Sequence, residues 1–423
     1  MHPKALLDAC AVLVGQVLKL EHPADAVVSR HFREHRELGQ RERATLAETV
    51  YAVLRYKLRF EHFAGSGSGP RERRLAILGF SGDGDFLRSA LSPAEKTWLD
   101  ACQQVPEAEL SERHRHNLPD WVVPPLKAQL GEEGFWALAG SLLQGAPLDL
   151  RVNALTDKRE DVRKELSLAG IPSELTPYSP WGLRVQDKPA LTRLDAFARG
   201  AIEVQDEGSQ LLALITDARR GQMVVDFCAG AGGKTLALGA AMRSTGRLYA
   251  LDVSAHRLDQ LKPRLARSKL SNVHPVAIAH ERDDRVKRLA GKVDRVLVDA
   301  PCSGLGTLRR NPDLKWRQKP ADVAELQVRQ QAILASAARL LKPGGRLIYA
   351  TCSILPDENE QVAEAFSAAH PGLKPLPVQG LLEQARVAQA ASLCSAGGLH
   401  LRLWPHLHGT DGFFAAAWEK PGG

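Results

Sequence analysis

The C-terminal half of this 423-residue chain is expected to form an α/β fold, a doubly wound and mostly parallel sheet. Short apolar runs alternate with helical segments, a glycine-rich turn follows the first run, and an acidic residue ends the second. The expected strands are Val224–Phe227, Leu248–Asp252, Val273–Val276, Val296–Asp299 and Leu347–Ala350. A helix over Val323–Leu341 joins the last two, and Lys342–Gly345 is expected to be the helix stop and turn.

Composition excludes several protein classes. A hydrophobic content of 44% can fill sizeable cores, yet no apolar run reaches the roughly 18 residues of a membrane span. The N-terminus carries an acid at Asp8 and lacks a signal-peptide pattern, so we expect a cytoplasmic protein that does not bind membranes. Six cysteines without a C-x-x-C predict reduced thiols and no metal site. The net charge of +7 fits a polyanionic partner.

The glycine-rich turn predicts a cofactor site. It runs from Cys228 to Thr235, between a strand and a helix, which bares backbone N–H groups at a helix N-terminus. A phosphate-binding P-loop would need glycine where Cys228 stands, and a dinucleotide fingerprint would need it where Thr235 stands. S-adenosylmethionine remains, because Asp252 at the end of the next strand can accept hydrogen bonds from both ribose hydroxyls.

Two cysteines follow buried strands. Cys302 ends the run that contains Asp299, and Cys352 follows Leu347–Thr351. If these strands are neighbours, about 4.8 Å apart, both sulfurs face one crevice at the carboxyl edge of the sheet. One thiol could then attack a substrate while the other assists its release. The alternative is that both are inert buried cysteines, since cysteine is among the most buried residue types.

Together these blocks resemble the Sun (Fmu) family of RNA 5-methylcytosine methyltransferases, and within it the branch of the small-subunit rRNA methyltransferase B. The resemblance spans nearly the whole chain and departs from the family pattern at Gly230-Ala231, where Ala-Pro is usual; cofactor binding is expected to survive this loss of a proline. The matching blocks are Leu150–Asn153, Val204–Gln210, the glycine turn, Asp299–Gly304, Arg309–Asp313, Tyr349–Ser353 and Gly409–Phe414.

The resemblance implies three domains. Residues 1–140 would form a helical NusB-like RNA-binding domain, residues 141–212 a small α+β subdomain, and residues 213–423 a Rossmann-like methyltransferase domain dependent on S-adenosylmethionine. Helical spacing supports the first, as in Leu46, Val50, Val53 and Leu54. The arginine-rich stretch Arg30–Arg43 is then either a solvated helix face or a face that contacts RNA.

The resemblance also implies roles for the site residues. Cys352, in the Thr-Cys motif, would attack carbon 6 of cytosine, Cys302 would serve product release, and Asp299 would contact ring nitrogen 3. Lys234 either contacts the base or caps the turn, and Asp283 is favoured over Asp284 as the acid near the adenine. The expected cofactor-binding residues are Cys228, Ala229, Gly230, Ala231, Gly232, Gly233, Lys234, Asp252, Asp283 and Asp299.

The expected activity is therefore S-adenosylmethionine-dependent methylation of a cytosine in 16S rRNA by a monomer. Alternatives are methylation of tRNA or another RNA, a non-catalytic RNA-binding ribosome assembly factor, and DNA cytosine methylation through the Pro-Cys thiol. The basic run Arg309, Arg310, Lys315 and Arg317 beside the cysteine loop offers phosphate contacts, with a solvated loop as the alternative. Trp316 is expected to anchor that loop rather than to stack on a base.

Overall fold

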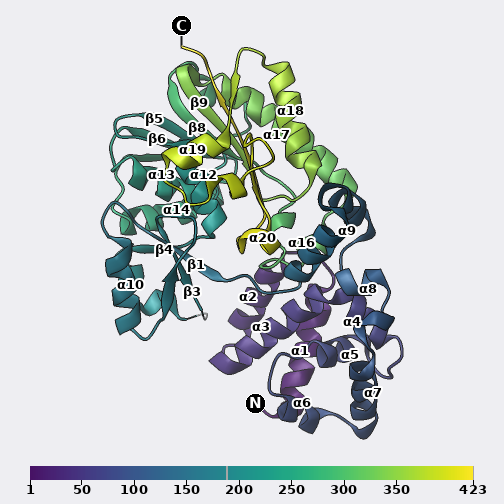
Figure 1. Cartoon of the computed structure of the whole chain (residues 1–423). Helices are drawn as coiled ribbons and strands as arrows, with labels where there is room; N and C mark the ends of the chain where they lie inside the picture. Colours follow the sequence, from purple (N-terminus) through teal and green to yellow (C-terminus); the bar gives the residue numbers. More distant parts are fainter. Residues whose placement is uncertain (187–188, 423) are drawn as a thin grey trace. The chain divides into compact units, whose positions relative to one another are not determined.

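A computed structural model describes residues 1–186 and 189–422 (Figure 1). It divides into two compact units. The first contains Met1–Gly145 and, from much later in the chain, Thr307–Pro320. The second contains Ala146–Gly306 and the chain from Ala321 onward. No helix in the described ranges is long and apolar enough to cross a membrane. The three-domain division stays a prediction.

The first unit is helical. Its core is built from the predicted spacing: Leu46, Val50, Val53 and Leu54 are all at most 1% exposed. Val12, in contrast, is 56% exposed and lies outside the apolar face of its helix. The helices are α1 (Pro3–Val17), α2 (Ala24–Glu34), α3 (Gln40–Arg55), α4 (Lys57–Ala64), α5 (Arg71–Leu78), α6 (Gly84–Ala90), α7 (Pro93–Gln104), α8 (Glu112–His116), α9 (Val123–Leu142) and the short α16 (Leu314–Arg317).

The second unit begins with a small antiparallel sheet of order β2-β3-β1-β4. Leu150, Val152 and Leu183 of this sheet pack against Val162 and Leu166 of the helix α10 to form a separate core. The α+β character predicted for this region is therefore present. The elements are β1 (Leu148–Val152), α10 (Arg159–Leu168), β2 (Ser173–Leu175), β3 (Gly182–Val185), α11 (Asp195–Ala198) and β4 (Ile202–Val204).

The large sheet of the second unit has the order β10-β12-β9-β8-β5-β6-β7, with β11 paired to β12. The run β9-β8-β5-β6-β7 is parallel and contains all five predicted strands. The strands are β5 (Met223–Asp226), β6 (Arg247–Asp252), β7 (Val273–Ala277), β8 (Val293–Asp299), β9 (Leu341–Thr351), β10 (Lys374–Leu376), β11 (Leu401–Leu403) and β12 (Phe413–Glu419).

Both faces of this sheet are covered by helices, which explains the continuous apolar runs of its strands. Val224 and Ile348 belong to one core cluster, whereas their neighbours Val225 and Leu347 belong to the cluster on the opposite face. Besides α10 and α11, the helices of the second unit are α12 (Glu207–Thr216), α13 (Gly233–Ala241), α14 (Ala255–Arg267), α15 (Asp284–Lys287), α17 (Pro320–Ala338), α18 (Glu360–Ala369), α19 (Val378–Gln384) and α20 (Pro405–His408).

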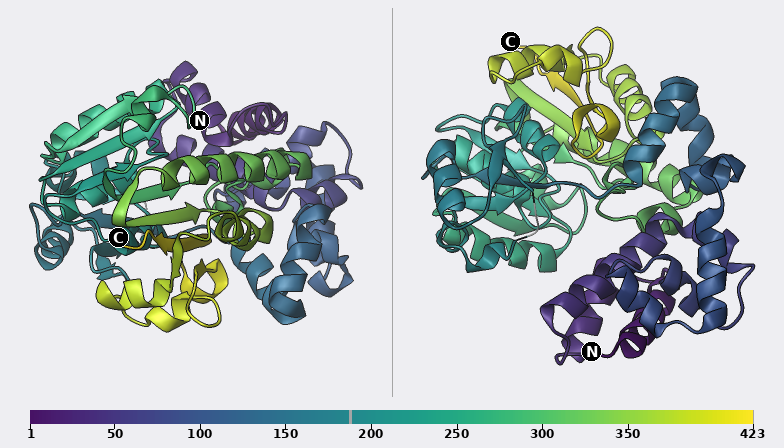
Figure 2. Two further views of the ribbon diagram at one scale, coloured as in Figure 1. Left: turned by 90° about the horizontal axis from the view of Figure 1, so that it is seen from above. Right: turned by 60° about the horizontal axis from the view of Figure 1, so that its bottom comes forward.

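The prediction of a turn over Lys342–Gly345 is wrong. The joining helix ends at Ala338, and these residues form the beginning of β9. The reason lies at the other end of the chain. The Lys420 carbonyl accepts a hydrogen bond from Gly344 N at 2.7 Å and Lys420 N donates to Gly345 O at 2.9 Å, so the C-terminal segment extends β9 through the run. Figure 2 shows this segment, in yellow, beside the green strands.

Candidate active site

The glycine turn connects β5 to α13 and fits a nucleoside-type cofactor. Gly232 stands at the N-cap of α13 with a φ of 84°, and a Cβ there would collide with the side chain of Leu261. A Cβ on Gly230 would instead meet no atom within 4 Å, so this residue faces open space. The turn thus leaves open space at Gly230 beside a helix N-terminus, a position that suits polar ligand groups.

Asp252, at the end of β6, lies directly against this turn. Its Oδ2 accepts a hydrogen bond from Gly230 N at 2.8 Å, and its Oδ1 accepts one from Ser254 N at 2.7 Å. Each carboxylate oxygen can accept more than one hydrogen bond, so both retain capacity for a ligand hydroxyl. Asp252, predicted to hold the ribose, and the glycine turn, predicted to bind the cofactor, are therefore in direct contact.

Asp226 is a buried acid at this edge that sequence reasoning missed. It ends β5, is 1% exposed, and accepts a hydrogen bond from Thr235 Oγ1 at 2.6 Å. Burial raises the pKa of Asp226 to about 7, and the charge of Asp299 adds to the rise. The signal available in the sequence was its place at the end of a strand, directly before the glycine turn.

The raised pKa predicts a pH-dependent effect of Asp226→Asn on stability. The ordinary pKa is 3.8, so ionisation of the buried group opposes folding increasingly from about pH 4 to pH 7. Asparagine removes that cost and still accepts from Thr235. We expect the variant to match the wild type near pH 4 and to exceed it by up to about 4 kcal/mol at pH 8. Denaturant unfolding without cofactor measures this, and parallel stability curves would refute the assignment.

Lys234 and Asp299 form an ion pair between the turn and the cysteines. Lys234 Nζ donates to Asp299 Oδ2 at 2.7 Å. Although burial lowers the pKa of Lys234, the charges of Asp299 and of the Cys352 thiolate raise it above its ordinary value. The Lys234 ammonium is therefore within electrostatic reach of Cys352 as well as of Asp299.

The two predicted cysteines face each other. Because β8 and β9 are parallel neighbours, Cys302 Sγ and Cys352 Sγ lie 3.4 Å apart. The hydrogen bond to Cys352 and burial raise the pKa of the Cys302 thiol well above its ordinary value. The two sulfurs are within hydrogen-bonding distance, and either one can be the donor. The expectation that the two sulfurs lie side by side at one edge of the sheet is confirmed.

The loops around the thiols meet at Gly306. Its N–H donates to Cys352 O at 2.8 Å, and its carbonyl accepts from Gly412 N at 2.8 Å. A side chain on Gly306 would collide with the backbone carbonyl oxygens of Gly412 and Cys352. The turn Gly409–Gly412, one of the sequence blocks described above, is therefore part of the scaffold of this site.

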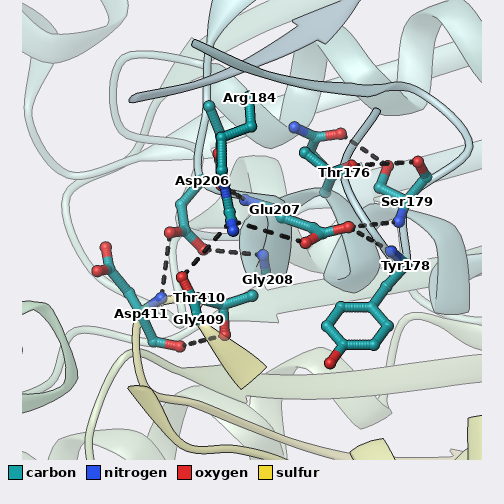
Figure 3. Close-up of polar contacts among 12 residues, drawn as sticks. Thr176, Tyr178, Ser179, Arg184, Asp206, Glu207, Gly208, Gly409, Thr410 and Asp411 are labelled. Atoms are coloured by element: carbon teal, nitrogen blue, oxygen red, sulfur yellow. Dashed lines mark hydrogen bonds and ion pairs between the residues drawn. The ribbon is translucent and has the colours of Figure 1, made fainter. Parts of the chain in front are cut away.

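A network of polar contacts holds the turn Gly409–Gly412 in place (Figure 3). Asp206 Oδ2 accepts from Asp411 N at 3.1 Å, and its Oδ1 accepts from Gly208 N at 2.8 Å. The adjacent Glu207 is fully buried and accepts from the backbone N–H groups of Tyr178 and Ser179 at 2.6 and 2.7 Å. Burial raises the pKa of Glu207. The block Val204–Gln210 thus joins the small sheet to the turn beside the cysteines.

Asp283 and the basic run after Cys302 were also predicted to contact ligands. Asp283 caps α15 and accepts from Ala279 N and Arg285 N, both at 2.9 Å; its contact with an adenine stays a prediction. The prediction that Lys315 contacts phosphate is wrong, because its side chain is 2% exposed and donates to Arg55 O at 2.9 Å. Trp316 does anchor the loop, donating to Leu54 O at 2.7 Å.

Comparison with known proteins agrees with this arrangement. Residues 213–419 match the family model of the 16S rRNA methyltransferase RsmB/F, and residues 118–192 match the ferredoxin-like domain of RsmF/B-like methyltransferases. A protein named "Probable ribosomal RNA small subunit methyltransferase B" from Synechocystis is 35% identical over 74% of this chain and 69% of its own length. The chain belongs to the RsmB/F methyltransferase family. Its methyl donor is S-adenosylmethionine.

Other relatives extend the same similarity. The ribosomal RNA small subunit methyltransferase B of Pasteurella multocida is 33% identical over 73% of this chain and 67% of its own. Among solved structures, PH0851 is 26% identical with a TM-score of 0.79, covering 99% of this chain and 98% of its own. The fold of NSun6 from Pyrococcus horikoshii, solved with SFG, is also similar, at 21% identity and a TM-score of 0.63 over 71% of this chain and 98% of its own.

Proposed function

We propose that this RsmB/F-family methyltransferase methylates carbon 5 of a cytosine in small-subunit rRNA. The observation that carries the proposal is the thiol pair, with its two sulfurs 3.4 Å apart and an ammonium–carboxylate pair beside them. Carbon 5 of cytosine is too weak a nucleophile to take a methyl group unaided. Addition of a thiolate at carbon 6 makes the ring an enamine, and this chemistry requires one activated cysteine and one group that serves release.

In this proposal Cys352 is the nucleophile: it interacts electrostatically with the Lys234 ammonium, and its sulfur lies 3.4 Å from that of Cys302. As the Cys352 Sγ–carbon 6 bond forms, the negative charge that develops on the ring is neutralised by a proton taken up at ring nitrogen 3, and Asp299, paired with Lys234, accepts a hydrogen bond from that N–H. Bound S-adenosylmethionine supplies an electrophilic methyl group, which carbon 5 accepts. A base must then remove the carbon 5 proton, so that the Sγ–carbon 6 bond breaks and the thiolate leaves.

Cys302 is suited to this last step. Once Cys352 is bonded to carbon 6, its hydrogen bond and its charge no longer raise the pKa of the Cys302 thiol, and burial and Glu358 are the causes that remain. The Cys302 thiol can then ionise and assist removal of the carbon 5 proton. This division explains why two thiols are needed at one site.

The target is identified by bisulfite sequencing of RNA from a strain lacking the gene and from its parent. We expect one cytosine of 16S rRNA to be protected from conversion in the parent and converted in the deletion strain. Complementation with the Cys352→Ala variant should leave it converted. Loss of protection at a tRNA cytosine instead would support the alternative substrate class, and unchanged protection at every cytosine would refute cytosine-C5 methylation.

Cofactor affinity should depend on Asp252. Asp252→Ala removes a charge-assisted acceptor from the ribose and a partner from Gly230 N. We expect S-adenosylmethionine affinity to fall about ten- to a hundredfold, corresponding to roughly 1.5–3 kcal/mol. Calorimetric titration measures this. Asp259→Ala is the matched control, since that exposed carboxylate on α14 pairs with Lys262. Equal affinity of a folded Asp252→Ala protein would contradict the assignment.

We also propose that the helical unit contributes RNA affinity through the exposed side chains of Arg30, Arg33 and Arg36. Replacing all three by glutamine should weaken 16S rRNA binding and reduce the salt slope by about 2, since each phosphate left without its arginine lowers it by roughly 0.7–0.9. Filter binding at several salt concentrations measures both quantities. Arg88→Gln is the control, because Asp100 already pairs with that guanidinium. An unchanged slope in the triple variant would assign the stretch to a solvated face.

A further inference from the structure

A buried carboxylate lies beneath the cysteine pair and has no role in the chemistry described above. Glu358 is 0% exposed and ends the short 3₁₀ turn Pro356–Glu358, just after β9. Its Oε1 accepts from Ser303 N at 2.8 Å and its Oε2 from Ser303 Oγ at 2.5 Å. Both oxygens are therefore committed to the residue that follows Cys302.

A third donor completes the site. Gln330 Nε2, on α17, donates to Glu358 Oε1 at 3.1 Å and to Pro301 O at 2.9 Å. The backbone on both sides of Cys302 is thus held, directly at Ser303 and through Gln330 at Pro301. A carboxylate in a dry interior is costly unless donors surround it, and here three donors do so. The arrangement is specific to an acceptor-only side chain of this length.

The next residue has the corresponding role for the other thiol. Asn359 Oδ1 accepts from Thr351 Oγ1, and Asn359 Nδ2 donates to Ser353 O at 3.0 Å. These partners are the two neighbours of Cys352 in the chain. The hydroxyls of Ser303 and Ser353 lie 3.2 Å apart and join the two halves. Consecutive side chains, Glu358 and Asn359, therefore hold the loops of the two cysteines separately.

We propose that Glu358 and Asn359 are positioning residues with different duties: Glu358 places Cys302 for product release, and Asn359 places Cys352 for attack. The inference rests on the proposed function, because it takes over the roles assigned there to the two thiols. Neither residue touches substrate or cofactor in this scheme. The hydrogen bond to Cys352 and burial raise the pKa of the Cys302 thiol most, and the negative charge of Glu358 raises it further.

The proposal is tested in the full-length protein with Glu358→Gln and Asn359→Ala, incubated with S-adenosylmethionine and 16S rRNA. In Glu358→Gln one acceptor oxygen becomes an NH₂ group that opposes a Ser303 donor, so the Cys302 loop shifts. We expect a protein–RNA adduct, stable in denaturing electrophoresis, to accumulate at least tenfold over wild type, with kcat lowered and cofactor affinity unchanged. Asn359→Ala should form little or no adduct and should also lose methylation.

Controls separate this proposal from simple destabilisation and from failure of the proposed function. Glu360→Gln removes a carboxylate two residues away, which pairs with Arg402, and should leave adduct level and kcat unchanged. Glu358→Asp keeps the charge and should restore turnover in part. If Glu358→Gln does not fold, Ser303→Ala removes the hydroxyl donor alone and should give the same adduct. If Cys302→Ala accumulates the adduct but Glu358→Gln and Ser303→Ala do not, the positioning role of Glu358 is wrong and the proposed function stands. If Cys302→Ala does not accumulate the adduct, the roles assigned to the two thiols are wrong.

A second readout needs no RNA. Alkylation by iodoacetamide, followed by peptide mass spectrometry, reports the pH at which each thiol ionises. Removing the Glu358 charge lowers the Cys302 pKa, so Cys302 in Glu358→Gln should react several-fold faster at pH 9 than in wild type, while Glu360→Gln should match wild type. An unchanged Cys302 rate in a folded Glu358→Gln protein would overturn the placement of that thiol by Glu358.

Discussion

Cys352→Ala should abolish both methylation and the covalent protein–RNA complex, whereas Cys302→Ala should still attack RNA and then fail to release it. Without the Cys352 thiolate nothing adds to carbon 6, and we expect turnover to fall by about 10⁴-fold or more. In Cys302→Ala, Cys352 and its charged neighbour Lys234 are still present, so addition and methyl transfer proceed. Elimination lacks its assistant, and the adduct accumulates.

Denaturing electrophoresis with radiolabelled rRNA, run beside a methyl-transfer assay, distinguishes the two variants. Cys394→Ala is a control for thiol loss in the same unit, since Cys394 lies in the C-terminal segment and is partly exposed. If the adduct accumulated with Cys352→Ala instead, the roles would be reversed, as in DNA cytosine methyltransferases that attack with the Pro-Cys thiol. If both variants kept full activity, the thiols would be structural and the proposed mechanism would be wrong.

The parallel half of the sheet could be predicted from sequence because its signals are local. Val296–Asp299 and Leu347–Ala350 are apolar runs with buried faces on both sides, and each is followed by a cysteine at the same sheet edge. Given that β8 and β9 are neighbours, the 3.4 Å approach of the sulfurs follows from the strand spacing. The glycine turn and Asp252 were predictable for the same reason.

The antiparallel half could not be predicted, because it depends on pairing between segments distant in sequence. β12 pairs with β9, and Lys420, directly after β12, bonds the backbone of Gly344 and Gly345. Residues Lys342–Gly345, expected as a turn, are therefore the beginning of a strand. Glu358 and Asn359 were missed for a related reason. Their partners, Ser303 and Thr351, become visible as such only once the two loops are folded together.

The basic run after Cys302 shows how composition can mislead. Lys315 and Trp316 follow the Cys302 loop in sequence, yet they belong to the helical unit together with Met1–Gly145. Both donate to backbone carbonyls at the C-terminal end of α3, where the helix dipole favours a cation. Burial lowers the pKa of Lys315 well below its ordinary value. Lys315, part of a basic run that suggested phosphate binding, thus attaches the segment Thr307–Pro320 to the helical unit.

Trp316→Ala should therefore release the segment Thr307–Pro320 and impair catalysis without touching the thiols. The indole packs against the core of the helical unit and donates to Leu54 O at 2.7 Å. Its removal leaves a cavity and an unpaired carbonyl, which we expect to destabilise that unit by about 3–5 kcal/mol. Trp316→Phe keeps most of the packing and should cost about 1–2 kcal/mol.

The catalytic consequence follows from chain connectivity. Thr307 directly succeeds Gly306, whose N–H holds the carbonyl of Cys352. A segment that moves freely from Thr307 onward loosens that hydrogen bond, so kcat should fall at least tenfold in Trp316→Ala while affinity for S-adenosylmethionine stays the same. Hydrogen exchange measures the cause separately, as reduced protection over 307–320. If protection over 307–320 fell but kcat did not change, the segment would stabilise the helical unit without affecting catalysis. If protection were retained, Trp316 would not anchor the segment.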